Sequence, residues 1–289
     1  MANSIALFKK YVDLLDEVYK ASAKTAVLES DSSLMAAGAA ANEIIVPKIS
    51  MDGLADYSRN GGYVGGDVTL TNETVKFNFD RGRTFTVDAM DNEETAGVAF
   101  GRLSSEFIRT KVVPELDAFR FATLAKNTGY TVAGATLATG TDVLDALVKA
   151  QGAMDENEVP EEGRILFITP SLYNLVMAVD TTKSKEVLNS FTEIVKVPQA
   201  RFFTAIDQLD GTTSGEEAGG FKKDPTDGKD INFLIVEKSA VLQYTKHNVS
   251  KAISPEENQE ADAWKFFFRS YGLADVYDNK TAGIYLHNK

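Results

Sequence analysis

Residues 44–126 constrain the fold most strongly, because a long two-stranded pattern runs directly into a long amphipathic helical pattern. Ile44, Val46 and Ile49 open an extended run, and Pro47 within it lacks an amide donor, as the edge of a sheet tolerates. A two-stranded ribbon is marginally stable alone in water. The apolar face of this ribbon therefore needs cover, and we expect another copy of the protein to provide it.

A glycine-rich stretch at residues 60–66 separates the two strands of the ribbon. Gly61, Gly62, Gly65 and Gly66 permit positive φ angles, so this stretch predicts a sharp reversal at the tip. The returning strand alternates apolar and polar residues with a two-residue period, breaks at 80–83 and then resumes. The alternating apolar residues are Val75, Phe77, Phe79, Phe85 and Val87.

A helix is predicted to start near Met90, because the acidic and amide side chains of residues 91–94 suit a helix N-terminus. Pro114 removes one intrahelical hydrogen bond, which predicts a kink or break near Val113. Gly129 marks the expected end of the element. An apolar stripe at spacings of three and four runs along it through Phe100, Leu103, Phe107, Leu116, Phe119 and Leu124.

Composition excludes several classes of protein. The chain has 289 residues and 44% hydrophobic content, enough to bury a substantial core. Its net charge of −12 opposes binding to nucleic acids and to anionic membranes through charge alone. The absence of cysteine rules out disulfides, thiolate catalysis and cysteine-ligated metals. Packing and assembly must therefore stabilise the protein.

Neither a signal peptide nor a membrane anchor is evident. Residues 5–18 are amphipathic rather than continuously apolar, and no run approaches the roughly 20 apolar residues that a spanning helix needs. The small-residue stretch at 35–41 is too short for that purpose. We expect the protein to be cytosolic when made, without contact with membranes.

From residue 130 onward the pattern changes to alternating helices and strands. Thr141 or Asp142 suits the N-cap of a helix that reaches Met154. A buried strand at 164–168 leads into a helix that Pro170 opens. A polar, glycine-containing loop at 209–230 then precedes an apolar strand at 233–236. No internal repeat is present.

A search for catalytic, cofactor-binding and metal-binding residues yields no candidate. His247 and His287 are the only histidines, and their settings favour surface or packing roles. Asp224, Asp227 and Asp230 miss the ligand spacing of a calcium loop. The glycines at 61–66 lack the lysine and the helix start of a phosphate-binding loop, and the aromatic cluster at 264–268 is assigned to packing. The sequence predicts no enzyme activity.

Five segments, in this order, resemble the major capsid proteins of tailed bacteriophages with the Hong Kong 97-type fold. No single segment is specific, but the order is, and the similarity covers nearly the whole chain. The segments are DRGRTF (80–85), VDAMD (87–91), VPELDAFR (113–120), VPQARF (197–202) and YDNKTAGIY (277–285).

The resemblance implies an α+β fold with an N-terminal arm, an extended β-hairpin loop and a long spine helix, besides peripheral and axial domains. The implied division places the arm at 1–45, the extended loop at 46–88 and the peripheral domain with its spine helix at 89–128. The axial domain follows at 129–245, and residues 246–289 return to the peripheral domain. Only about 45 residues precede the loop, so a separate scaffolding protein is implied.

The implied function is structural. The chain would assemble in the host cytoplasm into pentamers and hexamers of an icosahedral head that encloses double-stranded DNA, with a scaffolding protein and a portal as partners. DNA would be contacted only indirectly, and no cofactor is expected. The extended loop would lie across a neighbouring copy, and the residues assigned to this assembly interface are Val75, Phe77, Phe79, Arg81, Arg83 and Phe85.

Two alternatives remain open from the sequence. An encapsulin-like compartment shell shares the fold but encloses an enzyme cargo. A soluble α/β enzyme is favoured only by the strand and helix at 164–179, and it predicts a compact monomer or dimer with a chemically equipped pocket.

Overall fold

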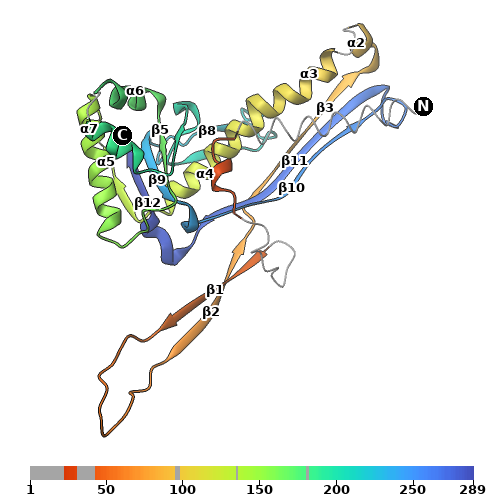
Figure 1. Cartoon of the computed structure of the whole chain (residues 1–289). Coiled ribbons are helices and arrows are strands. Elements are labelled where there is room, and N and C mark those ends of the chain that lie inside the picture. The colour runs from red at the N-terminus through yellow and green to blue at the C-terminus, as the bar shows by residue number, and fades with distance from the viewer. Residues whose placement is uncertain (1–22, 31–42, 95–97, 135, 180–181) are drawn as a thin grey trace.

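The computed structural model describes residues 23–30, 43–94, 98–134, 136–179 and 182–289, without the side chains of 93–102 (Figure 1). The amphipathic segment at 5–18, the small-residue stretch at 35–41 and the side chain of Phe100 lie outside these residues. Two sheet-bearing halves share one long helical element, and a two-stranded ribbon projects from the region between them (Figure 1).

The ribbon consists of antiparallel strands β1 (Glu43–Met51) and β2 (Val68–Lys76), joined by a long tip at 52–67. The predicted tip is therefore confirmed, and Gly62 adopts a positive φ of 76° there. Ser58 and Gly62 exchange two backbone hydrogen bonds, which close a small turn inside the tip.

The predicted break in the returning strand at 80–83 is wrong. Strand β3 (Phe79–Asp88) runs through these residues, and the interruption falls at 77–78 instead. The physical reason is long-range pairing, because β3 lies along β11 (Ala263–Val276) from Phe79 to Asp88. A Cβ on Gly82 would lie 2.9 Å from the Phe268 carbonyl oxygen, so this glycine permits close strand approach rather than a turn.

The first sheet is antiparallel with strand order β10 (Val241–Ile253), β11, β3. Helical segments α2 (Ala89–Glu94), α3 (Val98–Phe107), η3 (Ile108–Val112) and α4 (Val113–Lys126) follow β3. Figure 1 shows the helical element running beside this sheet, and their shared core holds the buried side chains of Phe79, Ile108, Val112, Val113, Leu116, Phe266 and Phe268.

The helix begins and bends differently from the prediction in detail. The Asp88 carboxylate, just before α2, accepts a hydrogen bond from the Met90 amide, so the N-terminal contact comes from outside 91–94. Near Pro114 the chain neither breaks nor stays α-helical: η3 is a π-helical turn, and Val113 N–H donates to the Ile108 carbonyl five residues back. This wider turn accommodates a residue without an amide donor. Helix α4 ends at Lys126, slightly before Gly129.

The second sheet has five strands in the order β4 (Tyr130–Val132), β12 (Ile284–Asn288), β9 (Ile231–Glu237), β5 (Arg164–Ile168), β6 (Glu193–Lys196). Helices α5 (Gly140–Asp155), α6 (Pro170–Ala178) and α7 (Thr182–Asn189) contribute to the core on one face. Phe121 and Leu124 of α4 pack into the core on the other face. Because both faces are covered, all five residues of β5 are buried, as its apolar run predicts.

Local details of this half refine the predictions. The N-cap of α5 is Thr139, not Thr141 or Asp142, and Asp142 completes a capping box with it. The stretch at 209–230 is not entirely loop, because β7 (Ile206–Leu209) pairs with β8 (Gly220–Lys223) to form a hairpin. Four short 3-10 segments complete the described elements: η1 (Ala26–Leu28), η4 (Gln199–Arg201), η5 (Lys238–Ala240) and η6 (Asp278–Gly283).

The C-terminal strands divide between the two sheets. Within 246–289, β11 and most of β10 belong to the first sheet. Strand β12 instead pairs with β9 and β4 in the second sheet. The last strand thus ties the chain end to the half that carries α5–α7.

Candidate assembly surface

The ribbon carries its apolar residues on opposite faces at its two ends. Register pairs Ile44 with Val75, and these side chains share one face with Val46. Near the base, that face packs against Leu242, Tyr244 and Leu273 of the first sheet. The apolar base of the ribbon is therefore covered by its own chain.

Farther out, the apolar residues lie on the other face. Ile49 is opposite Leu70 and Met51 is opposite Val68, so the four side chains form one patch. Their exposed fractions are 57% for Ile49, 63% for Met51, 67% for Val68 and 66% for Leu70. We call these four residues the distal face. Figure 1 shows the ribbon projecting away from both sheets, so no described part of the chain covers this face.

The tip beyond the distal face is also apolar and exposed. Leu54 is fully exposed, and Tyr57, Tyr63 and Val64 expose most of their surface. The rings of Tyr57 and Tyr63 contact each other with centroids 4.9 Å apart. A continuous apolar strip that solvent contacts on a monomer indicates a surface for another molecule.

An ionic contact marks the point where the ribbon leaves the body. Lys48 Nζ lies 2.5 Å from both Glu73 Oε2 and Asp278 Oδ2. The hydrogen bond with Asp278 raises the pKa of Lys48, and the same bond lowers the pKa of Asp278. Asp278 is exposed and the other two groups are half-buried, so solvent screens the contact and it stabilises the root of the ribbon only weakly.

The six residues predicted for the interface all make contacts within the chain. Val75 and Phe79 are buried, and Phe77 stacks on Tyr271 with ring centroids 4.9 Å apart. Phe85 is half-buried and its ring lies 4.8 Å from that of Phe107.

Arg81 and Arg83 connect the first sheet to the β7–β8 hairpin. Arg81 donates to Glu115 Oε1 at 2.7 Å and to the carbonyl oxygens of Leu209 and Gly220 at 2.7 and 3.2 Å. Arg83 donates to the carbonyl oxygen of Glu217 at 2.9 Å. Partial burial dominates at Glu115 and raises its pKa, although the ion pair with Arg81 opposes this shift.

A groove of about 550 Å³ lies between β3, the end of α3 and this hairpin. Its lining includes the aromatic rings of Phe85, Phe107 and Phe221 together with Lys111. The ion pair between Arg81 and Glu115 borders the groove, but nothing else in its lining resembles a catalytic arrangement.

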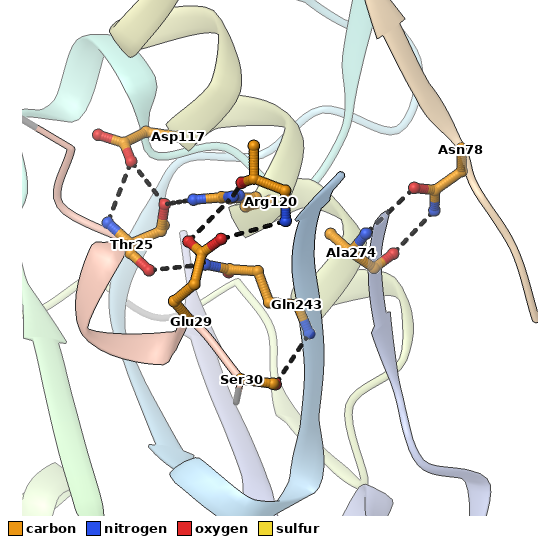
Figure 2. A network of polar contacts seen from close by, with 9 residues as sticks. Thr25, Glu29, Ser30, Asn78, Asp117, Arg120, Gln243 and Ala274 are labelled. Atoms are coloured by element: carbon orange, nitrogen blue, oxygen red, sulfur yellow. Dashed lines mark hydrogen bonds and ion pairs between the residues drawn. The ribbon is translucent and has the colours of Figure 1, made fainter. Parts of the chain in front are cut away.

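A buried polar network holds the segment at 23–30 between the two halves (Figure 2). The fully buried Asp117 carboxylate of α4 accepts from the Thr25 amide at 3.1 Å and the Thr25 hydroxyl at 2.8 Å, and from Arg201 at 2.9 Å. Arg120 donates to Thr25 Oγ1 and to Thr245 Oγ1. The network therefore joins the N-terminal segment, the long helix and both halves of the body.

Gln243 of β10 extends this network. Its side chain donates to the Thr25 carbonyl at 2.9 Å, and its backbone exchanges contacts with Ser30. Leu28 is fully buried in the core beside Phe121 and Leu124. No sequence motif predicts this network, because its members come from segments that lie about 90 to 220 residues apart in the chain.

Two polar residues considered in the sequence analysis, His287 and Asp224, make structural contacts. His287 is buried against the Phe233 ring, which lowers its pKa, and His247 is exposed. Asp224 accepts from the backbone amides of Thr226 and Asp227, as in a turn. Within the described ranges, no group of three or more His, Asp or Glu residues could hold a metal ion. No helix among the described residues is long and apolar enough to span a membrane.

The distal face was missed at the sequence level, although a signal was present. Ile49 and Met51 alternate with Ser50, just as Val68 and Leu70 alternate with Thr69. This two-residue period marks one apolar face of a strand. The interface predicted from the sequence uses phenylalanines nearer the body, of which Phe79 is buried and Phe77 and Phe85 are half-buried.

No family model matches the chain, and no curated protein matches it. Solved structures do. A Mycobacterium phage Che8 structure matches with a TM-score of 0.58 at 14% identity, covering 85% of this chain and 84% of the other. The capsid structure of cyanophage P-SCSP1u matches with a TM-score of 0.55 at 13% identity, covering 86% and 83%. A virus-like particle from Pyrococcus furiosus matches with a TM-score of 0.57 at 12% identity, covering 97% and 99%.

These similarities establish the fold. The chain has the α+β, Hong Kong 97-type fold of phage capsid structures, as the five sequence segments predict. The ribbon corresponds to the predicted extended hairpin, and α3, η3 and α4 together correspond to the predicted spine helix.

Proposed function

We propose that this protein is a structural capsid subunit that builds a closed shell by self-assembly. The observation that carries the proposal is the distal face, an apolar patch on a projecting ribbon that no described part of its own chain covers. Its fold is that of proteins from capsid structures, which supports the same role.

In this proposal the ribbon, which is β1, β2 and the tip between them, lies across the next copy. The face of the ribbon that carries Ile44, Val46 and Val75 packs against its own first sheet at the base. The distal face therefore supplies the contact between copies. Such a contact is heterologous, because a ribbon on one copy meets a different surface on the next, and heterologous contacts that close produce rings. Pentamers and hexamers of an icosahedral head are the rings that we infer.

The proposed division assigns the spine helix and the first sheet to a peripheral domain and residues 129–240, which precede β10, to an axial domain. Strand β12 is assigned to the axial domain because of its pairing with β9. The segment at 1–45 is the proposed arm, of which residues 23–30 are held by Asp117 and Arg120.

Double-stranded DNA is the proposed content of the shell. A net charge of −12 suits a container whose wall should not hold the genome tightly while it moves inward. The proposed partners are further copies, a separate scaffolding protein and a portal, with assembly in the host cytoplasm and a final place in the virion. The proposal includes no catalytic step.

The test is expression of the chain alone and with a candidate scaffolding protein, followed by size-exclusion chromatography and electron microscopy. Closed shells, or rings of five or six copies, are the expected products. A compact monomer under all conditions, with residues 46–88 resistant to protease, would refute the proposal and favour the soluble-enzyme alternative.

A shell that encloses a protein cargo is the second candidate. The observation in its favour is the match to the virus-like particle from Pyrococcus furiosus, which covers 97% of this chain and 99% of the other. Particles purified after nuclease treatment separate the two functions. Protected DNA supports the phage head, whereas a single co-purified protein without DNA supports the compartment.

A further inference from the structure

The strand that returns from the tip changes its pairing partner across residues 77 and 78. Strand β2 pairs only with β1 and ends at Lys76, whereas β3 pairs with β11 and begins at Phe79. Phe79 lies opposite Gly272, so a continued register would place Phe77 opposite Ala274. The ladder stops before that pair, and the direction of the ribbon is decided at this point.

The Asn78 side chain takes the place of the missing backbone pair (Figure 2). Asn78 Nδ2 donates to the Ala274 carbonyl oxygen at 2.7 Å, and the Ala274 amide donates to Asn78 Oδ1 at 3.1 Å. A primary carboxamide has an acceptor oxygen and two N–H donors, one of which lies on the same side as the oxygen, so it can donate to and accept from a single residue. It therefore satisfies both backbone groups of Ala274 while the main chain of β2 turns away from β11.

Two apolar residues that precede Asn78 contact the body through their side chains. Phe77 stacks on Tyr271, and the Lys246 ammonium lies 4.9 Å from the Phe77 ring centroid. Val75 turns into the cluster with Leu242 and Leu273. These apolar contacts hold the base of the ribbon but do not pair its backbone with the body.

We propose that Asn78 is the positioning residue that sets the direction of the ribbon relative to the first sheet. Through that direction it determines which surface of a neighbouring copy the distal face can reach, a consequence that rests on the proposed function. The apolar cluster at the base of the ribbon and the ionic contact of Lys48 with Asp278 are further attachments to the body.

Only a carboxamide of this length meets both requirements. Aspartate keeps an acceptor for the Ala274 amide but has no donor, and its charge repels the Ala274 carbonyl oxygen. Alanine has neither group. Both Asn78→Ala and Asn78→Asp should therefore release the ribbon, and only the first should also deprive the Ala274 amide of its acceptor.

The direction of the ribbon can be measured on the unassembled chain. Because the protein has no cysteine, Leu54→Cys at the tip and Lys149→Cys on α5 provide two specific spin-label sites, both exposed. Pulsed electron paramagnetic resonance then gives the distribution of tip-to-body distances. Asn72→Ala is the matched control, because Asn72 is an exposed asparagine of β2 that lies opposite Pro47 of β1.

The parent and the control should give the same narrow distribution, and both Asn78 variants should give a broadened or shifted one at an unchanged melting temperature. Amide hydrogen exchange at Ala274 should accelerate about fivefold in Asn78→Ala, the equivalent of one lost hydrogen bond, and less in Asn78→Asp. A parental distribution for Asn78→Ala would overturn the proposal. A lowered melting temperature together with faster amide hydrogen exchange throughout the body would also overturn it, since Asn78 would then stabilise the fold as a whole.

Shell formation is scored separately from the distance measurement. If the parent forms shells and Asn78→Ala retains the parental distance distribution, the positioning role fails while the capsid function stands. If the parent forms no shells but the Asn78 variants broaden the distribution, the capsid function fails while the positioning role stands.

Discussion

Replacing Ile49 and Leu70 by serine should weaken each contact between copies without affecting the fold of a single copy. The two side chains face each other across β1 and β2 and are 57% and 66% exposed. Fully burying a Leu or Ile side chain contributes roughly 1.5–3 kcal/mol. If a neighbouring copy covers the exposed part of both, the double variant loses about 2 to 4 kcal/mol per contact.

That loss corresponds to a factor of roughly 30 to 700 in the dissociation constant of one contact. The assay is the protein concentration at which rings or shells first form, followed by light scattering and confirmed by electron microscopy. The threshold should rise by at least the lower factor, because each copy in a ring uses the contact.

The matched control is Ser50→Ala with Thr69→Ala, a facing pair at the same depth on the opposite side of the ribbon. It should leave the assembly threshold unchanged, and both double variants should keep the parental circular dichroism spectrum. An unchanged threshold for the serine variant would refute the assignment of the distal face. Equal losses for both pairs would show that the ribbon matters but its face does not.

Three further predictions concern the body. Asp117→Ala should lower the free energy of unfolding by about 3–5 kcal/mol in urea titrations, because it leaves the buried donors of Thr25 and the partly buried Arg201 guanidinium without their acceptor. A loss below about 1 kcal/mol would contradict the structure. In α5, Gly140→Ala should lower the free energy of unfolding by roughly 1–3 kcal/mol, because its Cβ would lie 2.2 Å from a carbonyl oxygen of α6. Gly152→Ala has open space around it and should raise the free energy of unfolding by up to about 1 kcal/mol. Equal effects of the two variants in urea titrations would contradict that packing. Burial raises the pKa of Glu115 in the folded state above its ordinary 4.5, so on acidification the folded state binds this proton before the unfolded state does. Between the raised pKa and pH 4.5 this protonation should add stability to the parent protein. Glu115→Gln lacks this contribution and should lose stability more steeply than the parent, as urea midpoints between neutral pH and pH 4.5 would test.

Local sequence patterns predicted the elements whose signal does not depend on a partner far away in the chain. The strand at 164–168 has the predicted bounds because helices cover both of its faces, so an unbroken apolar run was sufficient to identify it. The helix that Pro170 opens and the ribbon with its glycine tip were predictable for a similar reason. In each case the signal lies within about ten neighbouring residues.

Patterns failed where a distant strand supplied the partner. Residues 80–83 combine charges with a glycine and suggest a turn, yet β11, nearly 190 residues later, pairs with them as a strand. The same strand makes Asn78 part of a backbone-like pair, which no sequence period reveals. The phenylalanines assigned to the interface are covered for the same reason.

The sequence by itself determined that the chain has a projecting ribbon, a long helix with an irregularity before Pro114 and a segment order typical of one capsid fold. The ribbon and the helix with its irregularity follow from hydrophobic period, glycine and proline, which act locally. The segment order indicates the fold only through its resemblance to a known family. Only the tertiary structure decided which face of the ribbon is free and that Asp117 and Arg120 hold the segment at 23–30. Exposure and buried charge pairing depend on what packs against a residue, and here those partners lie far away in the chain.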